Sequence, residues 1–387
     1  MTDIISIDKQ YVANTYARFP IQIVDGKGSI AVDVNGKEYI DLGTGIGVTA
    51  FGYCDEEWVS AVTKQLNTIQ HTSNLYYTSP CANLAKVLCE KTSFKKVFFG
   101  NSGAEANECA IKTARKYACD KKGQEFYKII TLNNSFHGRT ITTLAATGQE
   151  VFHKLFKPLT DGFLHVDAGD IDGLINSVEN NNVAAIMIEC VQGEGGVLPL
   201  SNDFVCAIEK VCKEKDILLI VDEVQTGNGR TGKLYSYMNF NLSPDIVTTA
   251  KGLGGGLPIG ACMFNEKTEN VLGFGDHGST FGGNPVAAAG ALNILNRIDD
   301  KLLDSVKEKS EYIFSELNGA KGVKSVSGMG LMVGIETEKP VKEVMAYCIE
   351  NGVLPLTAKT KLRLLPALNI PFDLLKKSIE IIKKACE

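Results

Sequence analysis

The chain has 387 residues, 40 of them basic and 45 acidic, and its net charge at pH 7 is −5. A chain of this length exceeds the size at which single hydrophobic cores stop growing, so we expect two domains. The mildly acidic balance, with lysines and acids interspersed, argues against binding to nucleic acid. The sequence has neither an apolar run of about 18 residues nor, over residues 1–6, the pattern of a signal peptide. We therefore expect a cytoplasmic protein that does not bind membranes.

The cysteines and histidines argue against disulfide and metal chemistry. The 11 cysteines are spread without a C-x-x-C pair, and the five histidines show no metal-ligand spacing. An odd number of scattered cysteines is not the pattern of a disulfide framework or of a zinc site. We expect reduced thiols in the core and no bound metal.

Strand and helix signals follow one another in an order that predicts an α/β fold. Near the N-terminus, residues 30–33 and 38–40 predict a hairpin around Asn35 and Gly36. Between about residues 50 and 280, apolar runs alternate with helical stretches, as in the βαβ units of a parallel sheet. The expected strands are residues 97–99, 128–131, 184–188 and 217–221, and the expected helices are residues 104–121 and 203–215.

From residue 287 onwards the pattern becomes that of a smaller α+β domain. An amphipathic helix is followed by strands at residues 324–326 and 332–335, a helix near residues 341–351 and a closing helix that ends at Glu387. We expect the N-terminal hairpin to join this part. The predicted organisation is a large domain over residues 50–285, with helices around a mostly parallel sheet, and a small domain built from residues 1–49 and 286–387.

An anion site is expected where the strand at residues 97–99 meets the helix that begins near Ala104. Ser102 and Glu105 have the spacing of a capping box between them. A helix N-terminus offers free backbone N–H groups and the positive end of the helix dipole, which together favour a phosphate. An ordinary capped helix without a ligand is the alternative at this point.

An acid and an amine follow two neighbouring buried strands. The aliphatic run 217–221 leads into Asp222, and residues 248–250 lead into Lys251. In open α/β sheets such strand ends collect the reactive groups, although a structural ion pair would look the same in sequence. A glycine-rich turn over residues 252–260 leaves room for a large flat group beside Lys251. A desolvated lysine attacks carbonyl groups, and pyridoxal 5′-phosphate offers an aldehyde and a ring nitrogen that needs a carboxylate.

Six motifs make the sequence resemble a known family, the class III, fold-type I aminotransferases that use pyridoxal phosphate. The motifs are residues 101–108, 136–140, 192–197, 222–227, 250–252 and 278–285. The resemblance extends from Tyr39 to Pro366 and is strongest to the branch that acts on acetylornithine. It implies a fold with a large cofactor-binding domain and a smaller domain from both chain ends.

The resemblance also implies which residues bind the cofactor. Lys251 would bind it covalently, and Asp222 would pair with its ring nitrogen. The other expected contacts are Phe136 and Val224 on the two ring faces, Gln225 at the ring hydroxyl, and Ser102, Gly103, Ala104 and Thr280 at the phosphate. Thr280 would come from a partner subunit, so the resemblance implies a homodimer with composite active sites. His137 is expected to support the loop that carries Phe136.

Substrate contacts implied by the resemblance are Arg139, Ser279, Glu194 and Arg363. A planar guanidinium matches a carboxylate in a bidentate way, so Arg139 would bind a substrate carboxylate unless it is a surface charge. Arg363 would bind the carboxylate of 2-oxoglutarate that lies nearest the reacting carbon. An ω-amine donor has no carboxylate there, and a buried unpaired arginine is costly, so Glu194 would cover Arg363 as a mobile gate. A permanent ion pair is the alternative.

The sequence departs from the family pattern at two positions, and one of them bears on the substrate. Ile46 stands where ornithine aminotransferases have a substrate-binding tyrosine, which favours an acylated ornithine. Cys190 stands where relatives usually have proline, and we expect no effect on the chemistry. The implied reaction converts N2-acetylornithine and 2-oxoglutarate to N-acetylglutamate 5-semialdehyde and glutamate, in arginine biosynthesis. Ornithine, succinylornithine, N-succinyl-diaminopimelate and 4-aminobutyrate remain alternative donors.

One motif points elsewhere. Residues 227–232 match the G-x-G-x-x-G pattern of dinucleotide sites. The match is weak because residues 222–226 separate it from the preceding strand, and no acidic residue ends a strand about 20 positions further on. A nicotinamide-dependent dehydrogenase is therefore a distant alternative, and a non-catalytic pyridoxal-binding regulator is another.

Overall fold

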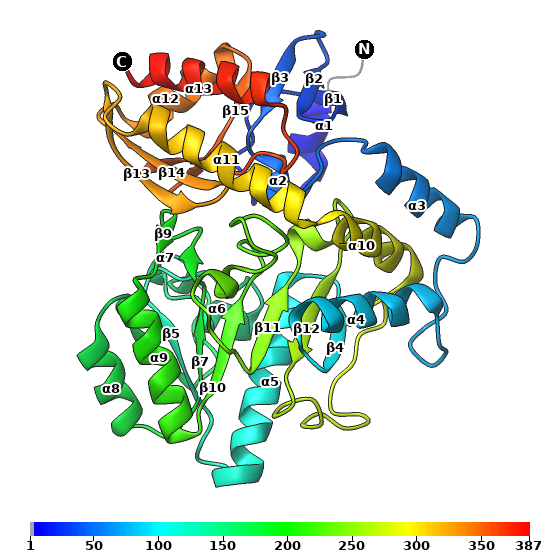
Figure 1. Cartoon of the computed structure of the whole chain (residues 1–387), viewed down its shortest axis with the longest axis vertical. Helices are drawn as coiled ribbons and strands as arrows, with labels where there is room; N and C mark the ends of the chain where they lie inside the picture. The colour runs from blue at the N-terminus through cyan, green and yellow to red at the C-terminus, as the bar shows by residue number, and fades with distance from the viewer. Residues whose placement is uncertain (1–3) are drawn as a thin grey trace.

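A seven-stranded sheet with helices on both faces lies below two smaller sheets in the computed structural model, which describes residues 4–387 (Figure 1). Residues 1–3, to which part of the signal-peptide argument refers, lie outside the described residues. None of the helices within residues 4–387 combines the length and apolar character needed to cross a bilayer.

The large sheet confirms the predicted α/β fold. Its strand order is β4-β12-β11-β10-β7-β5-β6, and only β12 runs antiparallel to its neighbours. The strands are β4 (Lys96–Gly100), β5 (Lys128–Leu132), β6 (Phe163–Val166), β7 (Val183–Ile188), β10 (Leu218–Asp222), β11 (Ile246–Thr249) and β12 (Gly260–Phe264). All residues of β7 and β10 are buried, as expected for strands covered on both faces.

Alternate residues of the central strands pack against helices on opposite faces. Leu218 and Ile220 lie in a cluster with apolar residues of α5, whereas Leu219 and Val221 lie in the larger cluster that includes α9. The helices around this sheet are α3 (Glu56–Leu66), α4 (Ser79–Thr92), α5 (Gly103–Lys122), α6 (Ile141–Ala146), α7 (Glu150–His153), α8 (Ile171–Glu179), α9 (Asn202–Lys215) and α10 (Pro285–Arg297). The predicted helices 104–121 and 203–215 are confirmed as α5 and α9.

The two chain ends share one of the smaller sheets. The predicted N-terminal hairpin is confirmed, and β15 extends it by pairing parallel to β3. The sheet order is β1-β2-β3-β15, with strands β1 (Ile23–Lys27), β2 (Ile30–Asp33), β3 (Glu38–Asp41) and β15 (Val353–Leu354). The second small sheet has the order β13-β14-β17-β16, with strands β13 (Val323–Met329), β14 (Met332–Thr337), β16 (Leu356–Ala358) and β17 (Lys361–Leu364).

Three C-terminal helices cover the small sheets: α11 (Asp300–Leu317), α12 (Val341–Glu350) and α13 (Phe372–Cys386). Helix α10 begins at the boundary that we expected at residue 285, but it packs against α3 and α4 beside the large sheet (Figure 1). The remaining division into two domains stays a prediction. Short elements complete the chain: α1 (Ile4–Tyr11), α2 (Thr44–Gly47), β8 (Val191–Gln192), β9 (Leu198–Pro199) and the 3₁₀ turns η1 (Ser236–Asn239) and η2 (Lys251–Leu253).

All 11 cysteines are free thiols. Six are buried, whereas Cys54 and Cys206 are exposed and Cys81, Cys89 and Cys119 are partly exposed, so the expectation of core thiols holds for only about half of them. Within residues 4–387, no group of three or more His, Cys, Asp or Glu side chains is arranged to hold a metal ion.

Candidate active site

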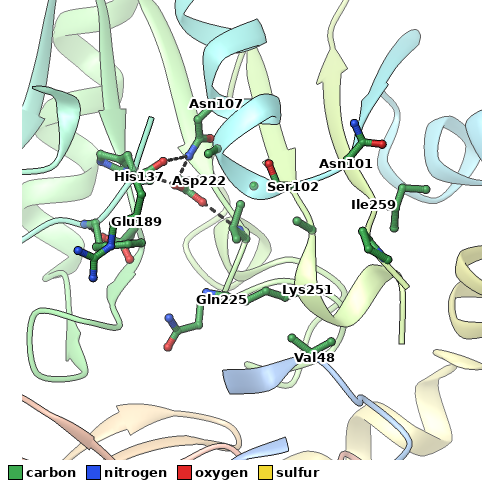
Figure 2. Close-up of a pocket in the computed structure, with 18 of the residues that line it drawn as sticks. Val48, Asn101, Ser102, Asn107, His137, Glu189, Asp222, Gln225, Lys251 and Ile259 are labelled. Carbon is green, nitrogen blue, oxygen red and sulfur yellow. Dashed lines mark hydrogen bonds and ion pairs between the residues drawn. The ribbon is translucent and has the colours of Figure 1, made fainter. Parts of the chain in front are cut away.

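A cavity of about 390 Å³ opens at the carboxyl ends of the strands of the large sheet. Its lining comes from the segments that directly follow β4, β5, β7, β10 and β11, which are far apart in sequence. Figure 2 shows Ser102, Asp222, Gln225 and Lys251 around this space. The sheet therefore brings the predicted cofactor residues, except Thr280, together at the edge where α/β folds place their ligands.

Asp222 is held in one orientation by three hydrogen-bond donors. Its Oδ2 atom accepts from Asn107 Nδ2 at 2.8 Å and lies 2.9 Å from His137 Nδ1, and its Oδ1 atom accepts from the Val224 N–H at 2.9 Å (Figure 2). Asn107 is oriented in turn by Thr248, whose hydroxyl donates to Asn107 Oδ1 at 2.6 Å. Asp222 is 3% exposed, and these hydrogen bonds compensate for the water that its carboxylate loses on burial.

Lys251 lies at the cavity wall in an unusual backbone conformation. Its φ of 45° is in the left-handed region, which costs a residue with a side chain about 1–3 kcal/mol. Within residues 4–387, its amine forms no ion pair, so the alternative of an Asp222–Lys251 salt bridge is wrong. Burial lowers the pKa of Lys251, although the charges of Glu194 and Asp222 oppose this shift. A lowered pKa increases the share of the nucleophilic free amine.

The turn before α5 presents free N–H groups to the cavity. Ser102 is the N-cap of α5, and its Oγ accepts from the Glu105 N–H at 3.2 Å. Glu105 accepts the N–H of Asn101, one residue earlier than in a standard capping box. The N–H groups of Gly103 and Ala104 have no partner within the described part of the chain. A Cβ on Gly103 would lie 2.6 Å from Val224, so this close packing requires glycine.

Phe136 and Arg139 approach the cavity from the loop after β5. The Arg139 guanidinium lies 4.3 Å from the ring centre of Phe152 and 5.4 Å from that of Phe136, and it forms no ion pair among the described residues. The Phe136 N–H donates to Glu189 Oε2 at 2.9 Å. Arg139 is therefore a positioned but unpaired cation at the mouth of the cavity, which suits a ligand carboxylate.

Glu194 and Arg363 are in contact beside the cavity. Arg363 Nη1 lies 2.5 Å from Glu194 Oε1 and donates to Gln225 Oε1 at 3.0 Å, and Gln225 Nε2 donates to Glu194 at 3.2 Å. The Arg363 side chain is 3% exposed and that of Glu194 is 29% exposed. Burial alone would raise the pKa of Glu194, but Arg363 more than offsets this and lowers it. The structure thus pairs these residues, and whether the pair opens stays a prediction.

Ser279 and Thr280 of the same chain lie outside the 390 Å³ cavity. They line a neighbouring hollow, where Ser279 Oγ accepts from Asn101 Nδ2 at 3.2 Å and Thr280 is exposed. A contribution of Thr280 to the site of a second copy is compatible with this position but stays a prediction.

Ile46 also lies near the cavity. It belongs to α2, two residues before Val48, which lines the cavity (Figure 2). Its φ of 67° is a strained value for a β-branched side chain, and 42% of the residue is exposed. A side chain held at such a cost next to the cavity is consistent with a role in substrate selection.

Sequence reasoning missed two residues of the site, Asn107 and Glu189, and one contact of a third, His137. Asn107 lies within the 101–108 motif, but its contact with Asp222 joins α5 to β10 and has no sequence signal. His137 was expected to support its loop, and it also contacts Asp222 directly. Glu189 lines the cavity at the end of β7, next to the buried Cys190, which does not line it. Burial raises the pKa of Glu189 to about 7, with His137 opposing and Asp222 adding to the shift.

Known proteins resemble the chain over nearly its whole length. A family model described as aminotransferase class-III matches residues 11–386. An acetylornithine aminotransferase from Haemophilus ducreyi is 48% identical over 378 residues, which cover 97% of this chain and 96% of that protein. Ornithine aminotransferase from Toxoplasma gondii ME49 superposes with a TM-score of 0.94 at 33% identity, covering 99% of this chain and 94% of that one.

A further solved structure agrees with the family match. N-acetylornithine aminotransferase from Stenotrophomonas maltophilia K279a superposes with a TM-score of 0.85 at 32% identity and covers 98% of each chain. The family resemblance read from the six motifs and the fold-type I architecture that it implied are confirmed. The chain therefore belongs to the class III aminotransferases.

Proposed function

We propose that this enzyme transfers the ω-amino group of N2-acetylornithine to 2-oxoglutarate, with pyridoxal 5′-phosphate as its cofactor. The products are N-acetylglutamate 5-semialdehyde and glutamate, so the reaction is a step of arginine biosynthesis. One observation carries the proposal: a buried arginine, Arg363, is covered by the partly exposed carboxylate of Glu194 beside the cavity of Lys251. The identity of 48% to an acetylornithine aminotransferase supports the same substrate.

The residues present fit this cofactor. Gly103 and Ala104 offer N–H groups at the N-terminus of α5 that have no partner among residues 4–387 and are free to bind the phosphate. Asp222 would face the ring nitrogen, and Lys251 would bind the aldehyde carbon. When bound, pyridoxal phosphate supplies an aldehyde that accepts an amine and a ring that draws electrons from the neighbouring carbon. Phe136 and Val224 would enclose the ring, and Gln225 would approach its hydroxyl.

The side chains of the enzyme orient the substrate and move its proton. Once the substrate amine has replaced it at the aldehyde carbon, the free Lys251 amine, with its lowered pKa, would take a proton from the reacting carbon and return it elsewhere. The hydrogen bonds from Asn107 and His137 fix Asp222, so the negative charge stays in one place. Arg139 would bind the α-carboxylate of the acylated donor, and Ser279 would lie near the same substrate.

The substrates of the two half-reactions differ in the group attached to the reacting carbon. Glutamate and 2-oxoglutarate have a carboxylate there, which would displace Glu194 and pair with Arg363. N2-acetylornithine has only hydrogen atoms there, so Glu194 would stay on Arg363 and keep this buried cation paired. The same site then accepts both substrates in turn.

We also propose a cytoplasmic homodimer in which Thr280 completes the phosphate site of the partner. Exposed apolar side chains beside Ser279 support this, since Asn74 donates to the Ser279 carbonyl at 2.8 Å and the following Leu75 and Tyr77 are 87% and 106% exposed in one copy. Large exposed apolar side chains that gather near a site indicate a protein interface. Sedimentation of the holoenzyme would reveal a dimer, and a fully active monomer would refute it.

A panel of amine donors tests the substrate proposal. Each donor is supplied with 2-oxoglutarate, and the glutamate formed is measured to obtain kcat/KM for N2-acetylornithine, succinylornithine, N-succinyl-diaminopimelate, ornithine and 4-aminobutyrate. We expect the highest value for N2-acetylornithine. A higher value for unacylated ornithine would contradict the role that we give to Ile46 and would place the enzyme with the ornithine aminotransferases that it resembles in structure.

A further inference from the structure

The G-x-G-x-x-G motif at residues 227–232 contains a buried arginine that the proposed reaction does not use. Arg230 is 3% exposed and forms no ion pair with any residue of the described range 4–387. Its Nη1 atom instead donates to two backbone carbonyls, those of Leu331 at 3.2 Å and Pro366. Both acceptors lie next to strands of the β13-β14-β17-β16 sheet. Leu331 lies in the turn between β13 and β14, and Pro366 lies two residues after the end of β17.

The backbone of this loop contacts the same turn in the opposite direction. The Leu331 N–H donates to the Arg230 carbonyl at 2.9 Å. A Cβ on Gly330 would lie 2.5 Å from that carbonyl oxygen, so the approach requires glycine at this position. The loop is therefore joined to the turn between β13 and β14 both by its backbone and by its arginine side chain.

Burying this cation is expensive, and a purely structural joint would not need it. A buried charge costs several kcal/mol unless other groups compensate, and well-packed apolar side chains often stabilise as much or more. Burial lowers the pKa of Arg230 to about 10, and the negative charge of Asp41 only partly opposes this. What the arginine adds is defined geometry, because its planar guanidinium donates in fixed directions to two carbonyls.

The geometry that Arg230 fixes is that of the carboxylate site. Gln225 precedes the loop by a few residues and accepts a hydrogen bond from Arg363 at 3.0 Å. Arg363 lies on β17, three residues before Pro366. We propose that Arg230 is a positioning residue for Arg363: it ties the segment after β17 to the segment after β10 and so holds the Arg363 guanidinium at the cavity. This inference rests on the proposed role of Arg363 in carboxylate binding.

Glutarate, a dicarboxylate without an amine, is a probe for this role because it can bind but cannot react. Its Kd is measured by calorimetry on the holoenzyme for wild type, Arg230→Met and Arg230→Lys. We expect Arg230→Met to weaken glutarate binding by about 10- to 100-fold, the factor that corresponds to losing a well-placed hydrogen bond to a charged group. The lysine variant keeps one donor for the two carbonyls and should lie between the two. Single-turnover rates with N2-acetylornithine should change much less than those with glutamate.

Arg297→Met is a matched control for a merely structural effect. Arg297 pairs with Asp55 in a bidentate manner at 2.5 and 2.9 Å, and this pair joins α10 to the N-cap of α3 without a residue of β17. This variant should lower the melting temperature but leave the Kd of glutarate unchanged. If Arg230→Met does not fold, the lysine variant decides. An unchanged glutarate Kd in a folded Arg230 variant would overturn the inference, whereas absence of glutarate binding to the wild type would overturn the proposed carboxylate site itself.

Discussion

Replacing Glu194 by alanine should separate the two half-reactions of this enzyme. Glu194 contacts Arg363 at 2.5 Å, and within the described part of the chain it is the acid that pairs with this arginine. After the substitution, the Arg363 guanidinium keeps Gln225 as its hydrogen-bond partner at 3.0 Å but has no counter-charge when N2-acetylornithine is bound. With glutamate bound, the substrate carboxylate itself supplies that charge.

The size of the effect follows from the burial of the pair. Leaving one partner of a buried pair alone costs about 3–5 kcal/mol. Because Gln225 remains and 29% of the Glu194 side chain is exposed, we take a lower value, about 2–3 kcal/mol. The half-reaction with N2-acetylornithine should therefore slow by about 30- to 150-fold at limiting substrate. The half-reaction with glutamate should stay the same or become faster, because the carboxylate no longer displaces Glu194.

Rapid mixing of the holoenzyme with each substrate alone measures the two half-reactions separately. Glu316→Ala serves as a control, because it removes a partly exposed carboxylate from an ion pair with Lys383 at 2.8 Å, in the C-terminal helices. This control should change neither rate. Equal slowing of both half-reactions in Glu194→Ala would refute the gate and would leave Glu194 as a fixed ion-pair partner.

The remaining predictions concern the catalytic groups, the dimer and the dependence on pH. Lys251→Ala should abolish turnover while the folded protein still binds cofactor non-covalently, and near-normal transamination in this variant would contradict its role. Asp222→Ala should keep the cofactor but slow proton removal by about 10²- to 10⁴-fold, and single-turnover rates close to wild type would show that the ring-nitrogen assignment is wrong. Mixing Lys251→Ala with Thr280→Ala subunits should restore activity, because each hybrid dimer has one intact composite site; mixtures that stay inactive despite forming dimers would argue against shared sites. Because burial raises the pKa of Glu189 from 4.5 to about 7, the folded protein holds this proton more tightly than the unfolded chain, and the resulting stability is present below pH 4.5 and lost as the pH rises to 7. Between pH 4.5 and 7, the unfolding free energy of Glu189→Gln should therefore fall less than that of wild type. An equal fall in both proteins, measured by chemical denaturation at each pH, would contradict this.

The fold and much of the site could be predicted because their signals are local. The aliphatic run before Asp222 and the alternation of apolar runs with helices predicted a parallel sheet, and β10 and its neighbours confirm it. Strand ends collect at one edge of such a sheet, which is why Asp222 and Lys251 meet at one cavity. The start of α5 was predictable from Ser102 and Glu105, although Glu105 caps Asn101 instead of Ser102.

Contacts that join distant elements had no sequence signal. Asn107 is one polar residue among many on α5, and only the packing of this helix on β10 brings it to Asp222. Arg230 was hidden in a motif that suggested dinucleotide binding, and its carbonyl partners come from two segments more than 100 residues away. The packing of α10 on α3 and α4 likewise depends on tertiary contacts, which the change of pattern at residue 287 did not reveal.

Transfer of labelled nitrogen tests the central claim most directly. N2-acetylornithine carrying an isotopic label only in its δ-amino group is incubated with 2-oxoglutarate and the holoenzyme, and the products are identified by mass spectrometry. We predict that the label appears in glutamate together with unlabelled N-acetylglutamate 5-semialdehyde, and that Lys251→Ala yields neither. Glutamate without label, or label retained in an acetylornithine that is not consumed, would contradict the proposed reaction.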